Sequence, residues 1–449
     1  MRAAAAAARP AALLPWLRGY GRDKLLRDAA AACVVATLLV PQSMSYALLM
    51  GVSPVYGLYS SVAPLAAHGL VSASSCTMVG IVAPMALTAL SVATQVAPPG
   101  TAQFSAEFAR VHVKLAFAAG LVALAVSALR LSWLAKHISG AVIAGFTYGA
   151  ACLIIASQVS DLLGVSYSPP ESLFGPLVAR ALQNAGGANR VAAVIGASNL
   201  LILLCAKSVK VGGAQLPKLT PLPLIVMAAM MAVSYAADLK GRFGVAIVGS
   251  IPGALPTLSI PFDSAAEFAV FLPYAAVLAA VAFVQQASIN SVFMAKKNER
   301  LDQQRELFAF ALSNTLGGLT QSVVSSASFS RSAVAFDAGA TTPMTSLLSA
   351  ALMAVAIVAL APALAYIPKA TLAAVVTSSV RSLLAPDAWL AHWRRGKLGD
   401  FFVMLFTLAM ILWLDVLYGL VAGIGVSLLL RAFAPRGGEE SEDSERDSV

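Results

Sequence analysis

The stretch "SSASFSRSAVAF", residues 325–336, places a single arginine in a part of the chain that otherwise carries no charge. The uncharged run before Arg331 begins at Leu307, and the nearest carboxylate after it is Asp337, six residues on. Side chains face each other on a helix at spacings of three or four, so Asp337 is a poor ion-pair partner for Arg331. The surroundings of this arginine decide what kind of protein the chain forms.

Composition indicates a membrane protein. Hydrophobic residues make up 59% of the 449 residues and charged residues 11%, whereas soluble domains carry roughly 25% charged residues. A helix of about 20 apolar residues spans the hydrocarbon core of a bilayer. Several stretches exceed that length without Asp, Glu, Lys or Arg: 29–106, 268–295, 307–330 and 338–368. We therefore predict an all-α membrane protein with many spanning helices.

The apolar pattern predicts fourteen segments, of which the third and the tenth are too short to cross a membrane alone. Each short segment follows a polar run, "SASSCTM" or "QSVVSSAS". If fourteen helices form two sets of seven, the third and tenth are equivalent. The predicted segments are roughly 27–50, 56–72, 80–94, 111–129, 138–160, 190–207, 219–237, 269–295, 304–321, 331–340, 344–365, 368–384, 400–415 and 416–434.

Basic residues gather in the short connections, and by the positive-inside rule these connections face the cytoplasm. The runs are separated by apolar spans, which argues against a nucleic-acid surface despite the net charge of +9. No cleavable signal is evident before the first apolar run. We therefore expect a multi-pass protein of the cell membrane with both ends cytoplasmic. The runs are "LRLSWLAKH", "AKSVKVGG", "AKKNERLDQQR" and "HWRRGK".

Paired broken helices are typical of inverted-repeat transporters, in which helix N-termini meet near the middle of the membrane. A helix N-terminus offers unpaired N–H donors and about half a positive charge, so two facing N-termini favour an anion. Hydroxyl groups of Ser328 and Ser330 add donors, and Arg331 adds a fixed positive charge. An arginine is tolerated inside a membrane protein where it lines a water-filled, anion-occupied cavity.

Five motifs resemble those of the SulP family of anion permeases. They are "VPQSMSYALLMGVSPVYGLYSSVAP" (40–64), "ISGAVIAGFTYGAACLIIASQVSDLLG" (138–164), "RLDQQREL" (300–307), "SASFSRSAVAFDAGATTPMTSLLSA" (326–350) and "IPKATLAAVV" (367–376). They occur in family order, and the resemblance covers roughly residues 20–434. It implies fourteen helices in a 7+7 inverted repeat, a core domain that moves against a gate domain, and an anion site between the third and tenth helices.

The resemblance also implies a set of substrate-binding residues. Other interpretations of single members remain: the two serines allow close helix packing, and Tyr46 also suits an interfacial aromatic belt. Val82 offers only its backbone N–H and an apolar wall. The predicted set is Gln42, Tyr46, Val82, Ala83, Gln285, Ser328, Phe329, Ser330 and Arg331.

Several positions depart from the family pattern. Gln285 stands where many members have a glutamate, and an amide cannot carry a proton. His68, Ser75 and Pro84 also differ from the usual wording. Family members generally continue into a soluble STAS domain, whereas this chain stops after an acidic run, so either a natural form without STAS or a truncated one is possible. The predicted division is a cytoplasmic lead (1–26), a transporter domain (27–434) and a disordered acidic tail (435–449).

Enzyme and metal functions find no support in the sequence. The four histidines have no ligand spacing, and no carboxylate pair lies within the spans. The four cysteines, Cys33, Cys76, Cys152 and Cys205, lie in or beside apolar segments without a CxxC spacing, so we predict small core residues.

We predict a secondary transporter of small anions, such as sulfate or a related oxyanion, bicarbonate or a dicarboxylate. It works by alternating access, requires no cofactor and, by family resemblance, forms a homodimer. Two alternatives keep the fold: a nucleobase permease, whose sites usually rely on intramembrane carboxylates, and a voltage-responsive protein that transports nothing.

Overall fold

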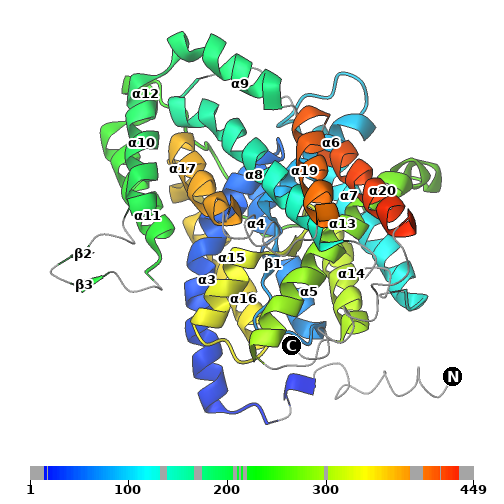
Figure 1. The fold of residues 1–449 in the computed structure, drawn as a ribbon. Helices are drawn as coiled ribbons and strands as arrows, with labels where there is room; N and C mark the ends of the chain where they lie inside the picture. Colours follow the sequence, from blue (N-terminus) through cyan, green and yellow to red (C-terminus); the bar gives the residue numbers. More distant parts are fainter. Residues whose placement is uncertain are drawn as a thin grey trace.

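The computed structural model describes residues 15–17, 19–131, 139–165, 174–205, 210–211, 214–215, 220–297, 302–384, 398–414 and 416–433. Within these residues the chain forms a bundle of helices around a buried centre (Figure 1). Five of the helices are both long and apolar enough to cross a membrane, and six shorter apolar helices accompany them. The predicted all-α membrane fold is confirmed.

The first half of the chain supplies the first seven predicted segments. The second of them is divided in two, because Pro64 lacks an N–H group and starts a new helix. The third consists of a short strand followed by a helix. The elements are α3 (Arg22–Leu49), α4 (Pro54–Tyr59), α5 (Ala63–Val71), β1 (Val79–Gly80), α6 (Ala83–Val96), α7 (Ala106–Ala128), α8 (Gly140–Leu163), α10 (Arg190–Cys205) and α11 (Leu222–Ala237).

The second half repeats this order, and its third segment is again a short strand followed by a helix. The elements are α13 (Ala265–Lys297), α14 (Gln303–Leu319), β4 (Ser326–Ala327), α15 (Phe329–Asp337), α16 (Met344–Leu364), α17 (Lys369–Val380) with the 3-10 turn η4 (Arg381–Leu384), α19 (Leu398–Trp413) and α20 (Val416–Phe433). The fold thus follows the predicted 7+7 arrangement with two broken helices.

Some elements were not predicted, and some boundaries differ. Helix α3 begins at Arg22, inside the stretch predicted as a lead. Residues Arg22–Arg27, which are exposed and mostly charged, extend the helix at its N-terminal end. The additional elements are η1 (Pro15–Leu17), α9 (Phe174–Gln183), η3 (Ala185–Gly187), β2 (Lys210–Val211), β3 (Ala214–Gln215) and α12 (Leu239–Phe243). The predicted tail, 435–449, lies outside the described residues.

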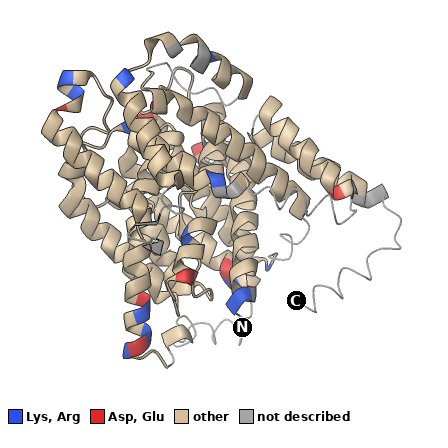
Figure 2. Ribbon diagram, turned by 60° about the vertical axis from the view of Figure 1, so that its left-hand side comes forward, with Lys and Arg blue, Asp and Glu red and all other residues tan. Residues whose placement is uncertain are grey.

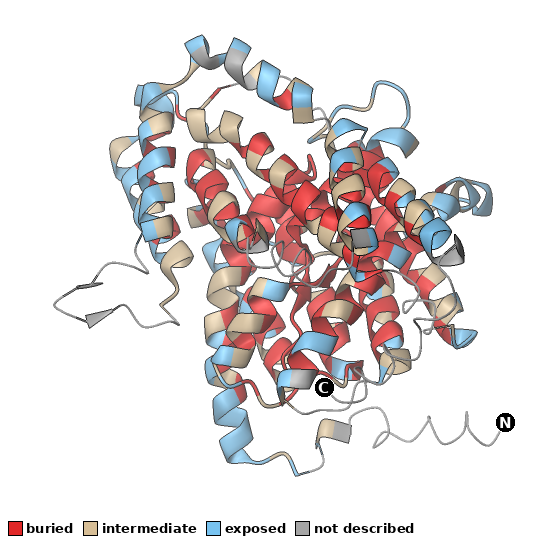
Figure 3. Cartoon of the chain, viewed as in Figure 1, coloured by how far each residue is buried: buried red, intermediate tan, exposed pale blue. Residues whose placement is uncertain are grey.

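Two groups of helices form the bundle: a core of α3–α7 and α13–α16, and a gate of α8, α10, α11, α17, α19 and α20. Glycines allow close packing within each group. A Cβ on Gly120 of α7 would lie 2.3 Å from the Thr315 backbone nitrogen of α14, and one on Gly145 of α8 would lie 2.4 Å from the Met404 carbonyl oxygen of α19. Buried residues fill the interior of the bundle, and exposed residues lie on its outside (Figure 3).

Charged residues are sparse along the helices, and most of those visible lie near helix ends (Figure 2). The predicted basic connections fall largely outside the described residues. The prediction for the cysteines was wrong for two of them: Cys33 and Cys205 are exposed on the outside of the bundle, Cys152 is half-buried and Cys76 is buried. An apolar sequence does not reveal which face of a membrane helix turns inward.

A buried carboxylate joins the first helix to the start of α16. Both oxygens of Asp28 on α3 accept hydrogen bonds from residues 341–345, at 2.6 Å from the Thr341 N–H and 2.5 Å from the Thr342 hydroxyl. Further donors are the hydroxyl groups of Thr341 and Thr345 and the N–H of Thr342. An acid beside free N–H groups that precede a helix is stabilised by the helix dipole. This contact fixes α16 against α3.

Candidate anion-binding site

Strands β1 and β4 bring the two broken helices together in the middle of the bundle (Figure 1). The strands pair antiparallel, with Val79 opposite Ala327 and Gly80 opposite Ser326. The Ser328 N–H continues the ladder to the Met78 carbonyl at 2.9 Å. Helix α6 starts three residues after β1, and α15 starts two residues after β4. Because the strands are antiparallel, α6 and α15 leave the ladder in opposite directions, and their N-termini lie close to each other at its two ends.

The first turn of α6 keeps its N–H groups free of side-chain caps. Its N-cap residue, Val82, has no oxygen to cap with, and Pro84 removes one of the donors altogether. In α15 the Ser328 hydroxyl caps the helix by accepting from the Arg331 N–H, at 3.4 Å, and also contacts the Ser330 hydroxyl at 3.2 Å. Free N–H groups at a helix start are ready donors for an anion.

A cavity of about 160 Å³ lies at these two N-termini. Seven residues of the predicted set line it: Tyr46, Val82, Ala83, Gln285, Ser328, Phe329 and Ser330. Such a space admits several water molecules or one small polyatomic anion. Its walls combine backbone donors and hydroxyl groups with apolar side chains, which is the usual make-up of a small-ligand site.

Arg331 does not line the cavity but lies behind its wall. Its side chain is completely buried, donating from one terminal nitrogen to the Ile81 carbonyl at 2.9 Å and from the other to Gln42 Oε1 at 3.3 Å. A Cβ on Gly80 would lie 3.2 Å from the guanidinium, so glycine there leaves room for it. Asp337 is exposed and is not its hydrogen-bond partner. The arginine thus lies behind the cavity wall and is hydrogen-bonded to the segment that leads into α6.

Gln42 also lies outside the cavity wall and joins the core to the gate. Its side-chain oxygen accepts from Arg331, and its Nε2 is 3.5 Å from the hydroxyl oxygen of Ser379 at the end of α17. Tyr46, one turn further along α3, contributes a cavity wall and is almost fully buried. The first helix therefore supplies one direct and one indirect member of the predicted set.

Gln285 of α13 reaches the cavity from the core side, and its Oε1 has no hydrogen-bond partner within the described part of the chain. Seven further residues line the cavity and were not in the predicted set: Pro84, Ile143, Thr147, Ser288, Ile289, Ser379 and Val380. Thr147, Ser379 and Val380 come from the gate helices α8 and α17. The polar pattern "VVTSSV" within an apolar helix was the available signal for Ser379.

A second cavity, of about 880 Å³, lies between the core and the gate on the face opposite the start of α3. It is lined by the end of α3, the 97–104 connection, the end of α8 and the start of α17. Ser45 borders this larger cavity, whereas the next residue, Tyr46, borders the smaller one. Both hollows therefore follow the boundary between the two groups of helices.

Comparison with known sequences gives relatives along almost the whole chain. The chain is 33% identical over 420 residues to sulfate transporter 4.1, chloroplastic, of Arabidopsis thaliana, covering 92% of this chain and 59% of that protein. It is 30% identical to solute carrier family 26 member 6 of Homo sapiens, with 93% and 56% covered. The chain spans about three fifths of the length of these relatives.

Solved structures share the fold. SLC26A9 superposes with a TM-score of 0.87 at 21% identity, covering 96% of this chain and 69% of that one. The transmembrane domain of the cyanobacterial bicarbonate transporter BicA gives a TM-score of 0.74 at 18% identity, covering 91% and 98%. The sequence pattern of the sulfate permease family matches residues 25–407. The chain belongs to the sulfate permease family.

Proposed function

We propose that this protein is a secondary transporter of small anions. The observation that carries the proposal is the pair of helix N-termini, held together by β1 and β4, at a small cavity between core and gate. The N-termini of two helices, two serine hydroxyls and a guanidinium behind the wall all favour negative charge. None of the fourteen residues that line the cavity is acidic.

The size and lining of the cavity favour a compact anion. Sulfate or a related oxyanion, bicarbonate and a small dicarboxylate combine negative charge with several hydrogen-bond acceptors, which N–H and hydroxyl donors can satisfy. The names of the relatives, sulfate transporter and bicarbonate transporter, agree with this class. Sulfate is the substrate to test first.

The arrangement of the walls supports alternating access. Tyr46 and Ser328 belong to the core, whereas Thr147 and Ser379 belong to the gate, so a movement of one group against the other changes access to the cavity. The polar contact between Gln42 and Ser379 crosses this boundary at 3.5 Å. The β1–β4 ladder lies wholly within the core, so the two helix N-termini move together.

We further propose the cell membrane as the location, with both chain ends in the cytoplasm, because basic residues concentrate in the connections on that side. A homodimer follows from the family resemblance. No cofactor takes part in the proposed function. A nucleobase permease is the weaker alternative, because the cavity wall offers no carboxylate for a base to bind.

The test is uptake of radiolabelled sulfate by proteoliposomes that contain the purified protein. We expect saturable uptake that unlabelled sulfate, bicarbonate or oxalate inhibits and that uracil leaves unchanged. Ionic gradients of sodium, protons and chloride are imposed one at a time to identify the coupling ion. Inhibition by uracil and not by anions would favour the nucleobase alternative, and voltage-induced charge movement without flux would favour a non-transporting protein.

A further inference from the structure

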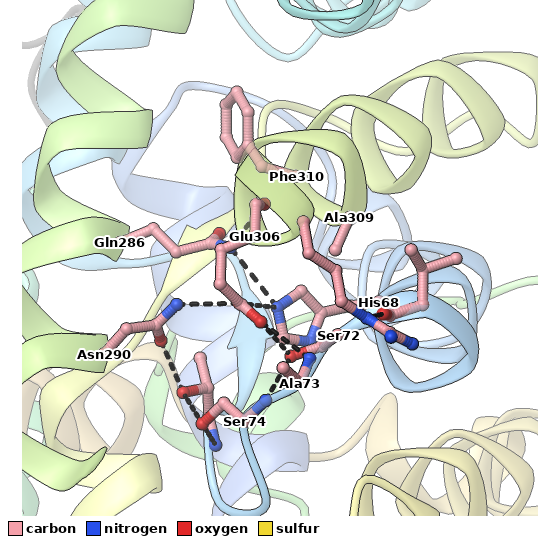
Figure 4. Close-up of polar contacts among 12 residues, drawn as sticks. His68, Ser72, Ala73, Ser74, Gln286, Asn290, Glu306, Ala309 and Phe310 are labelled. Atoms are coloured by element: carbon pink, nitrogen blue, oxygen red, sulfur yellow. Dashed lines mark hydrogen bonds and ion pairs between the residues drawn. The ribbon is translucent and has the colours of Figure 1, made fainter. Parts of the chain in front are cut away.

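A second buried polar cluster lies in the core, outside the cavity (Figure 4). Glu306 on α14 and His68 on α5 form its centre, and both side chains are almost completely shielded, with 1% exposed. Gln286 and Asn290 of α13 approach from one side, and the 72–77 segment from the other. Buried charges are rare inside membrane proteins and commonly mark functional sites.

The Glu306 carboxylate is satisfied as an anion. Its Oε1 accepts from the Ser72 hydroxyl at 2.9 Å and from the Ala73 N–H at 2.7 Å. Its Oε2 accepts from the Asn290 amide at 2.7 Å and lies 3.6 Å from His68 Nε2. A protonated imidazole at this distance turns a buried single charge into a neutral ion pair. Such pairing offsets much of the cost of burying the carboxylate.

The polar atoms around His68 suit two protonation states. Gln286 Nε2 lies 3.3 Å from His68 Nε2, an arrangement in which a neutral imidazole accepts from the amide. Gln286 Oε1 and His68 Nδ1 have no hydrogen-bond partner among the residues that the structure describes. Turning the Gln286 amide presents Oε1 to His68 instead, where it accepts from a protonated Nε2. The cluster thus holds donors and acceptors for imidazole both with and without the extra proton.

The remaining charged groups nearby are occupied elsewhere. Arg305, next to Glu306, donates to the Val71 carbonyl, and Lys297 of α13 donates to the Ser75 hydroxyl and the Ala340 carbonyl. Helix α16 carries no ionisable residue, and α7 carries none after Lys114. Other ionisable side chains make their contacts away from the cluster. Asp28 of α3 binds the start of α16, Lys296 lies over the Phe293 ring, and Glu267 pairs with Lys114 at the far end of α13.

A continuous chain of contacts connects the cluster to the anion site. Thr77 donates to the Asn290 oxygen at 2.5 Å, and the Met78 N–H donates to the Ser332 hydroxyl of α15. Three residues later the Ile81 carbonyl accepts from Arg331. The segment from Ser72 to Ile81 therefore touches the Glu306 cluster at one end and the start of α6 at the other.

We propose that His68 and Glu306 form a proton-binding site whose occupancy is coupled to anion binding. A proton bound by the His68–Glu306 pair cancels one negative charge next to segment 72–81, which leads into the N-terminus of α6. An anion at that N-terminus is then repelled less, so anion binding strengthens at acid pH. Linkage is reciprocal, so a bound anion also strengthens proton binding. The coupling rests on the proposed function, whereas the proton site itself does not. The His68–Glu306 pair also offers an ionisable site in a protein in which Gln285, an amide, cannot bind a proton.

The first test observes the proton site directly and needs no substrate. Protein labelled with ¹³C at histidine Cε1 contains four histidines, and the signal absent from His68→Gln is that of His68. We expect the chemical shift of this signal to change with pH and the change to be displaced in Glu306→Gln. His112→Gln, which removes another buried histidine, serves as the matched control and leaves the His68 signal in place. A His68 signal whose chemical shift is independent of pH overturns the proposal.

The second test measures sulfate affinity of the purified protein from pH 5.5 to 7.5. We expect wild-type affinity to fall by about tenfold across this range, within the span common for coupled sites, and His68→Gln to hold it constant within about twofold. If His68→Gln keeps the wild-type pH profile, the coupling is refuted even where the proton site is real. Absence of sulfate binding at every pH contradicts the proposed substrate, and the NMR test still decides the proton site.

Discussion

Replacing Arg331 by methionine tests whether the buried guanidinium contributes to anion binding through its charge. Its terminal nitrogen is bound to the Ile81 carbonyl, two residues before the start of α6. Two residues of chain, at about 3.8 Å between consecutive Cα atoms, separate Ile81 from the start of α6, so we take about 7 Å as the separation between the guanidinium and an anion on the first N–H groups of α6. At an effective dielectric constant of about 20, two unit charges at that separation interact by about 2.4 kcal/mol. This energy corresponds to about fifty-fold in affinity.

Methionine fills the volume without charge, and lysine keeps the charge without the planar fork. We therefore expect sulfate affinity to fall by about fifty-fold in Arg331→Met and by much less in Arg331→Lys. Isothermal titration of the purified variants with sulfate measures both. Lys114→Met is the matched control, since it removes a positive charge that pairs with Glu267 away from the cavity.

Loss of the guanidinium also leaves the Ile81 carbonyl and the Gln42 oxygen without their donor, at a cost of about 1–3 kcal/mol each. The unfolding temperature in detergent shows whether the variant remains folded. A folded Arg331→Met protein with affinity within about twofold of the wild type would refute the electrostatic role of this residue, because water screens a completely buried charge less than an exposed one.

Three further predictions test the cavity and the packing. Gln285→Glu places a carboxylate in the cavity wall, so sulfate uptake by proteoliposomes should weaken at neutral pH and recover at acid pH; a flat profile would contradict this placement. Single cysteines at Val82 and Ser330, in a background without the four native cysteines, should react with a water-soluble thiol reagent, and sulfate should slow both reactions; inert cysteines would argue against a shared wet site. In Gly57→Ala the new methyl group meets the Ser43 carbonyl at 2.0 Å, so we expect a clear loss of the unfolding temperature, and an unchanged value would show that α3 and α4 can separate at little cost.

Sequence patterns predicted the fourteen main segments and the two broken helices at the candidate site, because these follow from local signals. Uncharged runs set the spans, and a polar run before a short apolar segment indicated each broken helix. Five cavity residues of the predicted set, Val82, Ala83, Ser328, Phe329 and Ser330, lie at the two broken helices, whereas Tyr46 and Gln285 were predicted from the family resemblance. The family resemblance added the two-domain division, which periodicity alone does not give.

Features that depend on distant contacts could not be predicted in this way. The pairing of β1 with β4 joins segments 248 residues apart, counted from Val79 to Ala327, and neither two-residue strand has a periodicity to detect. Arg331 was expected to line the cavity, yet it turns towards Ile81 and Gln42, because those acceptors lie on elements far away in the sequence. His68 had no visible ligand spacing, and its partner Glu306 comes from another helix.

The contact between Asp28 and residues 341–345 has a consequence for how the protein is made. The carboxylate and its donors are separated by about 313 residues, so a ribosome adding about 5–20 residues per second supplies the donors about 15–60 s after the acid. During that time the Asp28 carboxylate has only the Tyr20 hydroxyl of its final hydrogen-bond donors, and the donors at residues 341–345 have not yet been made. We expect nascent α3 to keep its Asp28 end at the membrane surface, in contact with water or an insertion factor. It should reach its final depth after α16 has been synthesised.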